Sequence, residues 1–173
     1  MELHVAAALK QPGEIFLATL SQIIPPQDFG GREVVFAEPV QLEFTYSFDG
    51  KAFTLNGQMQ TALSSRCARC DEPFIEPLRF LLSERFIKGS PGDDEEDSYA
   101  FNGETLDLTS MVMDNLFLHV PISSVCSEGC RGLCPVCGCN LNTAQCACVQ
   151  EEPESVSSPL AALGPLLNDG KEV

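Results

Sequence analysis

The chain has 173 residues, of which 25 are acidic and 10 basic, and its formal net charge is −15. This balance argues against free-standing nucleic-acid binding, which uses a basic face, and leaves a basic protein partner or a local basic patch as routes to RNA. The N-terminus lacks a basic region ahead of a long apolar run, and no stretch approaches the roughly 20 apolar residues that span a bilayer. We therefore expect a cytoplasmic protein with no membrane partner.

The first third of the chain predicts strands that pair antiparallel. Residues 2–9 indicate a strand or edge segment, and residues 13–20 form an apolar segment of ambiguous type. Apolar and polar residues alternate over 40–48 and again over 51–63, which is typical of half-buried strands. Asp49-Gly50 lies between these two runs and is a strong signal for a β-hairpin.

The middle of the chain begins with a further strand and then changes character. Residues 74–89 indicate a long strand that Pro77 is expected to break, because proline cannot donate to a strand ladder. The acidic residues 90–98 predict a surface loop. Apolar residues recur at helical spacing over 105–121, which predicts a helix.

These elements predict an α+β fold in which a mainly antiparallel sheet packs against one helix, followed by a C-terminal cysteine-rich zinc-knuckle module. We expect three parts along the chain. Residues 1–125 form the α+β domain with the hairpin and a CxRC knuckle, and residues 126–149 form the zinc module. Residues 150–173 provide a polar linker and a short apolar segment.

Nine cysteines are the most informative residues of the chain. Their odd number and a reducing cytoplasm argue against a disulfide framework. Zinc takes four thiolates at tetrahedral corners, and two cysteines a few residues apart reach adjacent corners from one tight turn. Four pairs, in chain order, supply the predicted ligands: Cys67 and Cys70, Cys126 and Cys130, Cys134 and Cys137, Cys146 and Cys148. They predict two Zn²⁺ ions, each held by four cysteines, and leave Cys139 over.

Spacing alone leaves the grouping of the four pairs open. In one arrangement the first pair (Cys67 and Cys70) shares a site with the second pair (Cys126 and Cys130), and the two later pairs form the other site. In the other arrangement the second pair shares a site with the third pair (Cys134 and Cys137), and the first pair shares one with the fourth pair (Cys146 and Cys148). All-cysteine ligation indicates closed, structural zinc, because catalytic zinc keeps an open position and usually takes His or carboxylate ligands. The chain also lacks the common nucleophile, P-loop and metalloprotease motifs, so we expect no enzymatic activity and no small-molecule substrate.

An ordered set of motifs resembles a known family. "SSRCARCDEPF" follows the predicted hairpin, "ETLDLTSMVMDNLFLHVPISSVC" covers the predicted helix, and "CRGLCPVCGCNLNTAQCAC" follows it. From about Arg32 to the C-terminus this order resembles the YceD family of large ribosomal RNA subunit accumulation proteins. The resemblance implies a bacterial cytoplasmic protein that supports the synthesis, processing or stability of 23S rRNA, and thereby large-subunit biogenesis. The family motif has a variable position just after its CPxCG segment, and this chain departs from the motif by carrying a cysteine there, Cys139.

The resemblance implies a partner in the large ribosomal subunit, either 23S rRNA or a basic ribosomal protein. The predicted contacts form a local basic patch: Arg66, Arg69, Arg79, Arg85 and Lys88. Two alternative functions remain open from the residues alone. One is a zinc or thiol redox sensor, which the spare Cys139 suggests. The other is an acidic adaptor for protein interactions.

Overall fold

A computed structural model describes residues 1–89 and 98–148 of the protein. The chain divides into two compact units, residues 1–130 and 131–173. This division falls after Cys130, whereas the cysteine pattern predicts one after Val125. Nearly all of the predicted acidic loop and the whole predicted linker and apolar segment lie outside the described residues.

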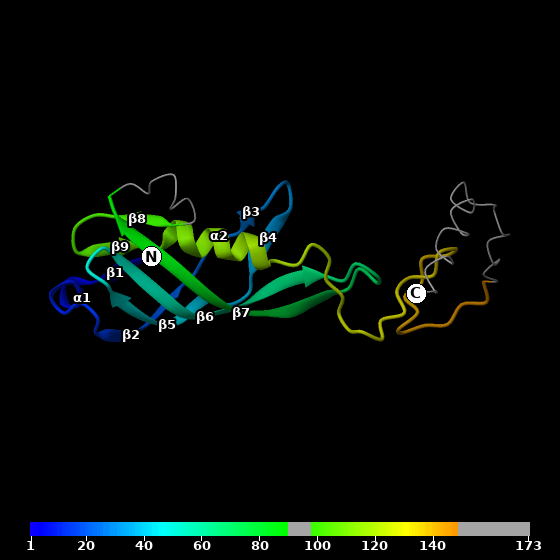
Figure 1. The fold of residues 1–173 in the computed structure, drawn as a ribbon. Coiled ribbons are helices and arrows are strands. Elements are labelled where there is room, and N and C mark those ends of the chain that lie inside the picture. Colours follow the sequence, from blue (N-terminus) through cyan, green and yellow to red (C-terminus); the bar gives the residue numbers. More distant parts are fainter. Residues whose placement is uncertain (90–97, 149–173) are drawn as a thin grey trace, which may run out of the picture. The chain divides into compact units, whose positions relative to one another are not determined.

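The first unit contains a seven-stranded sheet in which every strand pair except one is antiparallel (Figure 1). Its strands are β2 (Ile15–Gln22), β3 (Gln27–Asp28), β4 (Glu33–Phe36), β5 (Val40–Phe48), β6 (Ala52–Arg66), β7 (Pro73–Lys88) and β8 (Tyr99–Phe101). The order is β2-β5-β6-β4-β3, with β7 on the other side of β6 and β8 parallel to β7. The strand β6 is therefore the central element, because β5 and then β4 pair along one of its sides and β7 along the other.

Smaller elements complete the first unit. A two-stranded ladder joins β1 (Glu2–His4) to β9 (Thr105–Asp107), and the helices are α1 (Ala6–Lys10) and α2 (Thr109–His119). The α+β fold with a mainly antiparallel sheet is thus confirmed. Among the described residues, neither helix has the length and apolar run needed to cross a bilayer.

The predicted hairpin at Asp49-Gly50 is confirmed. It joins β5 to β6, and Phe48 lies opposite Phe53 at its base. The Asp49 carboxylate accepts hydrogen bonds from the Ala52 and Lys51 amides at 2.7 and 2.8 Å, which holds the pKa of Asp49 below its ordinary value. Gly50 adopts a φ of 98°, a conformation that side chains rarely tolerate. The turn is therefore specified by these two residues.

Two local predictions are wrong. Strand β7 runs unbroken through Pro77, which lies opposite Ala62 of β6. Among the described residues no strand pairs with the outer side of β7 at this point, so the missing N–H costs the ladder no bond. The expected strand over 2–9 is correct only at β1, because the alanine-rich residues that follow form helix α1, in keeping with their high helix propensity.

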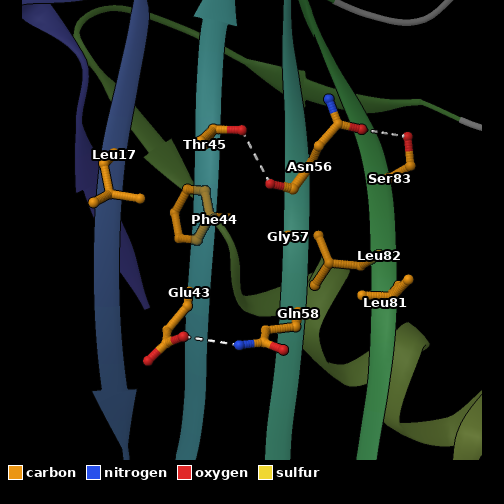
Figure 2. A pocket seen from close by; sticks show the side chains of 10 residues that line it. All are labelled: Leu17, Glu43, Phe44, Thr45, Asn56, Gly57, Gln58, Leu81, Leu82 and Ser83. Atoms are coloured by element: carbon orange, nitrogen blue, oxygen red, sulfur yellow. Dashed lines mark hydrogen bonds between the residues drawn. The ribbon is translucent and has the colours of Figure 1, made fainter.

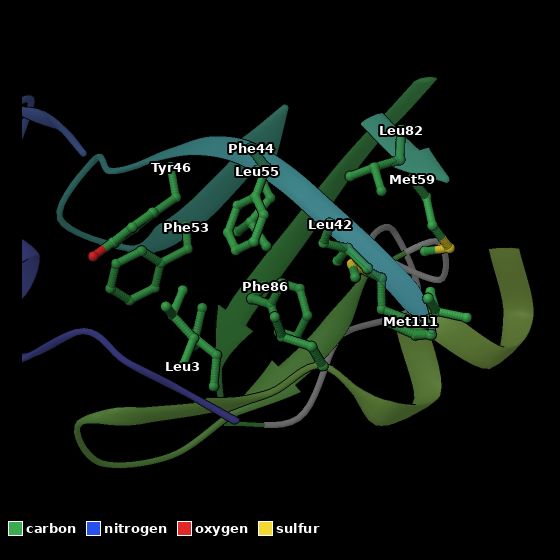
Figure 3. Packing of buried hydrophobic residues seen from close by; sticks show 14 of the residues in the cluster. Leu3, Leu42, Phe44, Tyr46, Phe53, Leu55, Met59, Leu82, Phe86 and Met111 are labelled. Carbon is green, nitrogen blue, oxygen red and sulfur yellow. The ribbon is translucent and has the colours of Figure 1, made fainter. Parts of the chain in front are cut away.

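Helix α2 covers the inner face of the sheet and closes the hydrophobic core (Figure 3). The helix is shorter than the predicted 105–121, because residues 105–107 form β9 instead. Alternate positions of β5, β6 and β7 face inward, and the core gathers the following side chains: Leu42, Phe44, Leu55, Met59, Leu82, Phe86, Met111, Val112 and Leu116. The polar residue Asn115 of α2 is also buried, and its amide donates to the Glu84 carboxylate at 2.7 Å.

Candidate metal centres

Cluster 1, defined as Cys67, Cys70, Cys126 and Cys130, lies in the first unit and has its four sulfurs within 4.8 Å of one another. The Sγ atoms of Cys67 and Cys130 are 3.7 Å apart, and so are those of Cys70 and Cys126. Four thiolates about 2.3 Å from a tetrahedral zinc ion stand about 3.8 Å apart, so the donor set fits that metal. Cys126 is exposed, whereas the other three cysteines are buried.

The tip of the β6–β7 hairpin supplies half of cluster 1. The connection from Arg66 to Pro73 folds tightly because the Cys67 amide donates to the Glu72 carbonyl and the Asp71 amide donates to the Cys67 carbonyl, each at 2.9 Å. Asp71 takes a φ of 59°, the left-handed conformation that such a turn requires. The result is a knuckle that aims both of its thiols to one side.

The segment after helix α2 supplies the other half of cluster 1. The Ala68 amide donates to the Ser124 carbonyl at 2.8 Å, which holds this segment against the knuckle. The guanidinium of Arg69 then donates to the carbonyls of Glu128 and Cys130, each at 3.1 Å. Arg69 is therefore a clamp between the two halves of the cluster.

Backbone amides aimed at sulfur set the ionisation of cluster 1. The Cys126 amide, together with those of Cys70 and Arg69, lowers the pKa of Cys67 to about 6. The Glu72 amide acts in the same direction on Cys70, but burial and the neighbouring thiols outweigh it and raise the pKa of Cys70 to about 12. Because four adjacent thiols cannot all ionise alone, a divalent cation that binds here displaces protons.

Cluster 2, defined as Cys134, Cys137, Cys139 and Cys146, lies in the second unit and also has its sulfurs within 4.8 Å of one another. A short antiparallel bridge between Leu133 and Asn140 brings its first three cysteines together. The Cys134 amide donates to the Cys139 carbonyl at 2.8 Å.

The turn within cluster 2 is a second knuckle. The Gly138 amide donates to the Cys134 carbonyl at 2.9 Å, and Gly138 adopts a φ of 72°. The amides of Cys137 and Val136 lower the pKa of Cys134 to about 6, as amides do for Cys67 in cluster 1. Both clusters therefore stabilise one thiolate before any cation arrives.

All eight predicted ligands lie in or beside the two clusters. Cluster 1 joins the first and second pairs, which is the first of the two groupings that the spacing allows. Cys139, which the pairing leaves over, lies inside cluster 2. Cys148 lies next to that cluster, and its thiol interacts with those of Cys137 and Cys146. The ligand set itself stays a prediction.

The basic residues predicted as partner contacts do not gather in one patch. Arg66 and Arg69 lie at the knuckle, and Arg66 pairs with Asp71 at 3.2 Å. Arg79 donates to the Gln58 side chain, and Arg85 lies 3.7 Å from Asp49. At about 3.3 Å per strand residue, Arg85 lies roughly 40 Å along β7 from the knuckle. Their role in contacting a partner stays a prediction.

The outer face of the sheet holds an open hollow of about 670 Å³ that sequence patterns did not indicate (Figure 2). Gly57 lies at its centre, and a Cβ there would lie 2.2 Å from the Glu43 carbonyl oxygen. Leu17 and Leu81 flank the hollow and are 78% and 81% exposed. Glu43 is the single ionisable residue in its lining, so the hollow lacks a pair of groups for acid–base chemistry.

The fold and the clusters define an α+β protein with two groups of cysteines at metal-binding distance. The family described as "Large ribosomal RNA subunit accumulation protein YceD" matches residues 55–167, well over half of the chain. The chain therefore belongs to the YceD family. The match includes all nine cysteines and the strand β7.

Relatives with similar sequences come from chloroplasts and mycobacteria. The chain is 28% identical to "Large ribosomal RNA subunit accumulation protein YCED homolog 1, chloroplastic" of Arabidopsis thaliana, over 72% of this chain and 48% of that protein. It is 26% identical to an uncharacterized protein of Mycobacterium tuberculosis, over 80% of this chain and 69% of that protein. The chain thus spans about half the length of the plant relative. No solved structure matches the chain.

Proposed function

We propose that the protein is a non-enzymatic factor that supports the synthesis, processing or stability of 23S rRNA, and thereby biogenesis of the large ribosomal subunit. The family match over residues 55–167 carries this proposal, since the family's description names accumulation of large-subunit ribosomal RNA. We place this activity in the cytoplasm of a bacterium.

We further propose that each cluster binds one structural Zn²⁺. The donors are cysteine sulfurs throughout, which suit zinc, and the 3.7 Å sulfur spacing of cluster 1 matches a tetrahedral site. With four cysteines around each ion, no position is left for a water molecule or a substrate. Zinc would then hold the two knuckles in shape and take no part in a reaction.

The proposed partner is 23S rRNA or a basic protein of the large subunit. A net charge of −15 favours a basic protein. Direct RNA contact would instead use the arginines of the knuckle and of β7. The salt dependence of the affinity distinguishes the two modes, because RNA binding through several phosphates weakens about tenfold or more on moderate increases in ionic strength. Filter binding to 23S rRNA fragments between 50 and 200 mM salt measures this response.

Depletion of the protein from its host tests the ribosomal proposal. We expect sucrose gradients to show a loss of large subunits and a fall in 23S rRNA relative to 16S rRNA. Wild-type protein supplied in trans should restore both, which separates this effect from slow growth. An unchanged ratio of 23S to 16S rRNA and an unchanged gradient would contradict the proposal while leaving the metal sites untouched.

A second candidate function is a zinc or thiol redox sensor. One observation favours it, namely that five thiols gather in the second unit, one more than a zinc ion takes. A sensor should release zinc at low peroxide concentration, before the sheet of the first unit changes. Simultaneous zinc release and general aggregation in a peroxide titration would exclude this function.

A further inference from the structure

The five cysteines of the second unit exceed the four ligands of a tetrahedral zinc ion. We infer that Cys139 and Cys148 are interchangeable fourth ligands of one metal ion, which Cys134, Cys137 and Cys146 hold at all times. This inference rests on the zinc-binding part of the proposed function and is independent of its ribosomal part.

Three cysteines form the constant part of the site. The thiol of Cys134 interacts with those of Cys146 and Cys137, and all three sulfurs lie within 4.8 Å of one another. Cys134 is buried, and the knuckle amides fix its sulfur in place. These three thiolates therefore occupy three corners of the tetrahedron.

Two cysteines compete for the fourth corner. The sulfur of Cys139 lies within 4.8 Å of those of Cys134, Cys137 and Cys146. Cys148 follows Cys146 by two residues, and its thiol interacts with those of Cys137 and Cys146. Both residues are half-buried, so either side chain can turn toward the site or away from it without uncovering a core. The two thiols thus share two neighbours, and Cys139 is the one whose sulfur lies within 4.8 Å of all three constant cysteines.

Charge and protons allow one of the two thiols to bind at a time. Five thiolates on one Zn²⁺ would carry a net charge of about −3, which is unfavourable on a chain that is already strongly acidic. The fifth cysteine therefore stays a protonated thiol. When Cys148 replaces Cys139 on the metal, Cys148 gives up its proton and Cys139 takes one up, so the charge of the site does not change.

Metal content of single and double variants tests the exchange. The wild-type chain should bind two zinc ions by mass spectrometry of the native protein and by a colorimetric zinc assay. Cys139→Ser and Cys148→Ser should each retain two ions, because the remaining cysteine takes the fourth position on the metal. The double variant should retain one ion. Cys134→Ser is the matched control and should also retain one.

Other metal counts overturn the inference in distinct ways. If one single variant loses an ion and the other does not, the fourth ligand is fixed. If the double variant keeps both ions, neither cysteine is needed. A wild-type second unit without zinc overturns the inference together with the zinc part of the proposed function, whereas a failed depletion experiment removes only the ribosomal part.

Alkylation of the zinc-loaded wild-type chain gives an independent test that needs no variant. Iodoacetamide should label about one cysteine per molecule in the second unit, because four of its five thiols are protected by the metal. Peptide mapping should find the label on Cys139 in some molecules and on Cys148 in others, with few molecules labelled at both. A label confined to one of the two residues would overturn the exchange.

Discussion

The two cysteine clusters share their chemistry but differ in what supports them. Cluster 1 lies at the tip of a hairpin whose strands belong to a large sheet, and three of its four cysteines are buried. Cluster 2 lies in a unit whose only buried described residues are Gly132 and Cys134. A metal ion in cluster 1 would therefore join parts of a domain that already has a core. In cluster 2 the metal ion would itself be the core.

Metal removal should give the largest difference between the two clusters. Structural zinc contributes on the order of 10 kcal/mol to small modules, so we expect residues 131–148 to unfold in a strong chelator. The strands of the sheet should keep their amide protection, because the hydrophobic core holds them. Hydrogen exchange read by mass spectrometry measures both regions in one experiment. If the sheet lost as much amide protection as residues 131–148, the expected difference between the two clusters would be contradicted.

Single ligand variants separate the clusters without a chelator. Cys67→Ser and Cys134→Ser should each reduce the bound zinc from two ions to one. We expect Cys134→Ser to abolish protection over residues 131–148. Cys67→Ser should leave the sheet folded and loosen only the knuckle and the segment after α2. Far-UV circular dichroism and hydrogen exchange check these outcomes, and general unfolding of Cys67→Ser would show that cluster 1 also supports the core.

Acid should release the metal from cluster 1 with a steep dependence on pH. Neighbouring thiols and burial raise the pKa values of Cys70 and Cys126, so both carry protons at pH 7 in the metal-free chain. Metal binding displaces these protons, and affinity must therefore fall as pH falls. At least two released protons predict a slope of about two in the logarithm of the zinc association constant per pH unit. Competition with a chelating dye between pH 6 and 8 measures this slope. A slope near zero would show that zinc binding does not displace protons from these thiols.

The substitution Gly57→Ala should disturb the sheet and leave cluster 2 intact. The added Cβ would lie 2.2 Å from the Glu43 carbonyl oxygen and 2.4 Å from the Cβ of Phe44, so β5 and β6 would have to separate. Overpacking of this kind costs about 1–3 kcal/mol in unfolding free energy. Gly129→Ala is the control, since nothing lies within 4 Å of its added Cβ. Urea unfolding compares the two variants, and equal stabilities would refute the close approach of the strands.

Loss of the Arg69 clamp should weaken cluster 1 by a smaller amount. Arg69→Ala removes two hydrogen bonds to the segment that carries Cys126 and Cys130, at a cost of about 1–3 kcal/mol. Arg66→Ala is the matched control, because its hydrogen bond and ion pair with Asp71 are exposed, contribute little and stay within the knuckle. The rate of zinc release from cluster 1 should rise in the first variant and stay unchanged in the second. Equal rates would show that Arg69 does not join the two halves.

Local signals predicted the elements that depend on neighbouring residues. Asp49-Gly50 and the alternating runs on both sides of it suffice for the hairpin, because turn geometry and side-chain alternation are properties of the local chain. Pro77 misled the prediction, since its effect depends on whether β7 has a neighbour on both sides. The helix α1 was missed because a short apolar run is compatible with either a strand or a helix.

The candidate sites were predictable in composition but not in arrangement. Cysteine spacing identified the pairs, but Cys67 and Cys130 meet only because β6, β7 and α2 bring together segments 63 residues apart. The place of Cys139 depends on the Leu133–Asn140 bridge, which is too short to leave a sequence pattern. The close spacing of Cys134, Cys137 and Cys139 was the signal that could have placed Cys139 in cluster 2. Grouping the cysteines in pairs left Cys139 out of the predicted site.

The unbroken pairing of β6 with β7 also sets a length. Their ladder runs from Ala52–Ile87 to Arg66–Pro73, with cluster 1 at its far end, and Figure 1 shows both strands continuing past α2 toward that tip. At about 3.3 Å per residue the ladder is roughly 45–50 Å long. Deletion of one residue from each strand would turn the knuckle to the opposite face of the sheet. Deletion of two from each strand would keep the knuckle on the same face and shorten the ladder by about 7 Å. The hairpin thus fixes both the reach and the orientation of cluster 1 within the first unit.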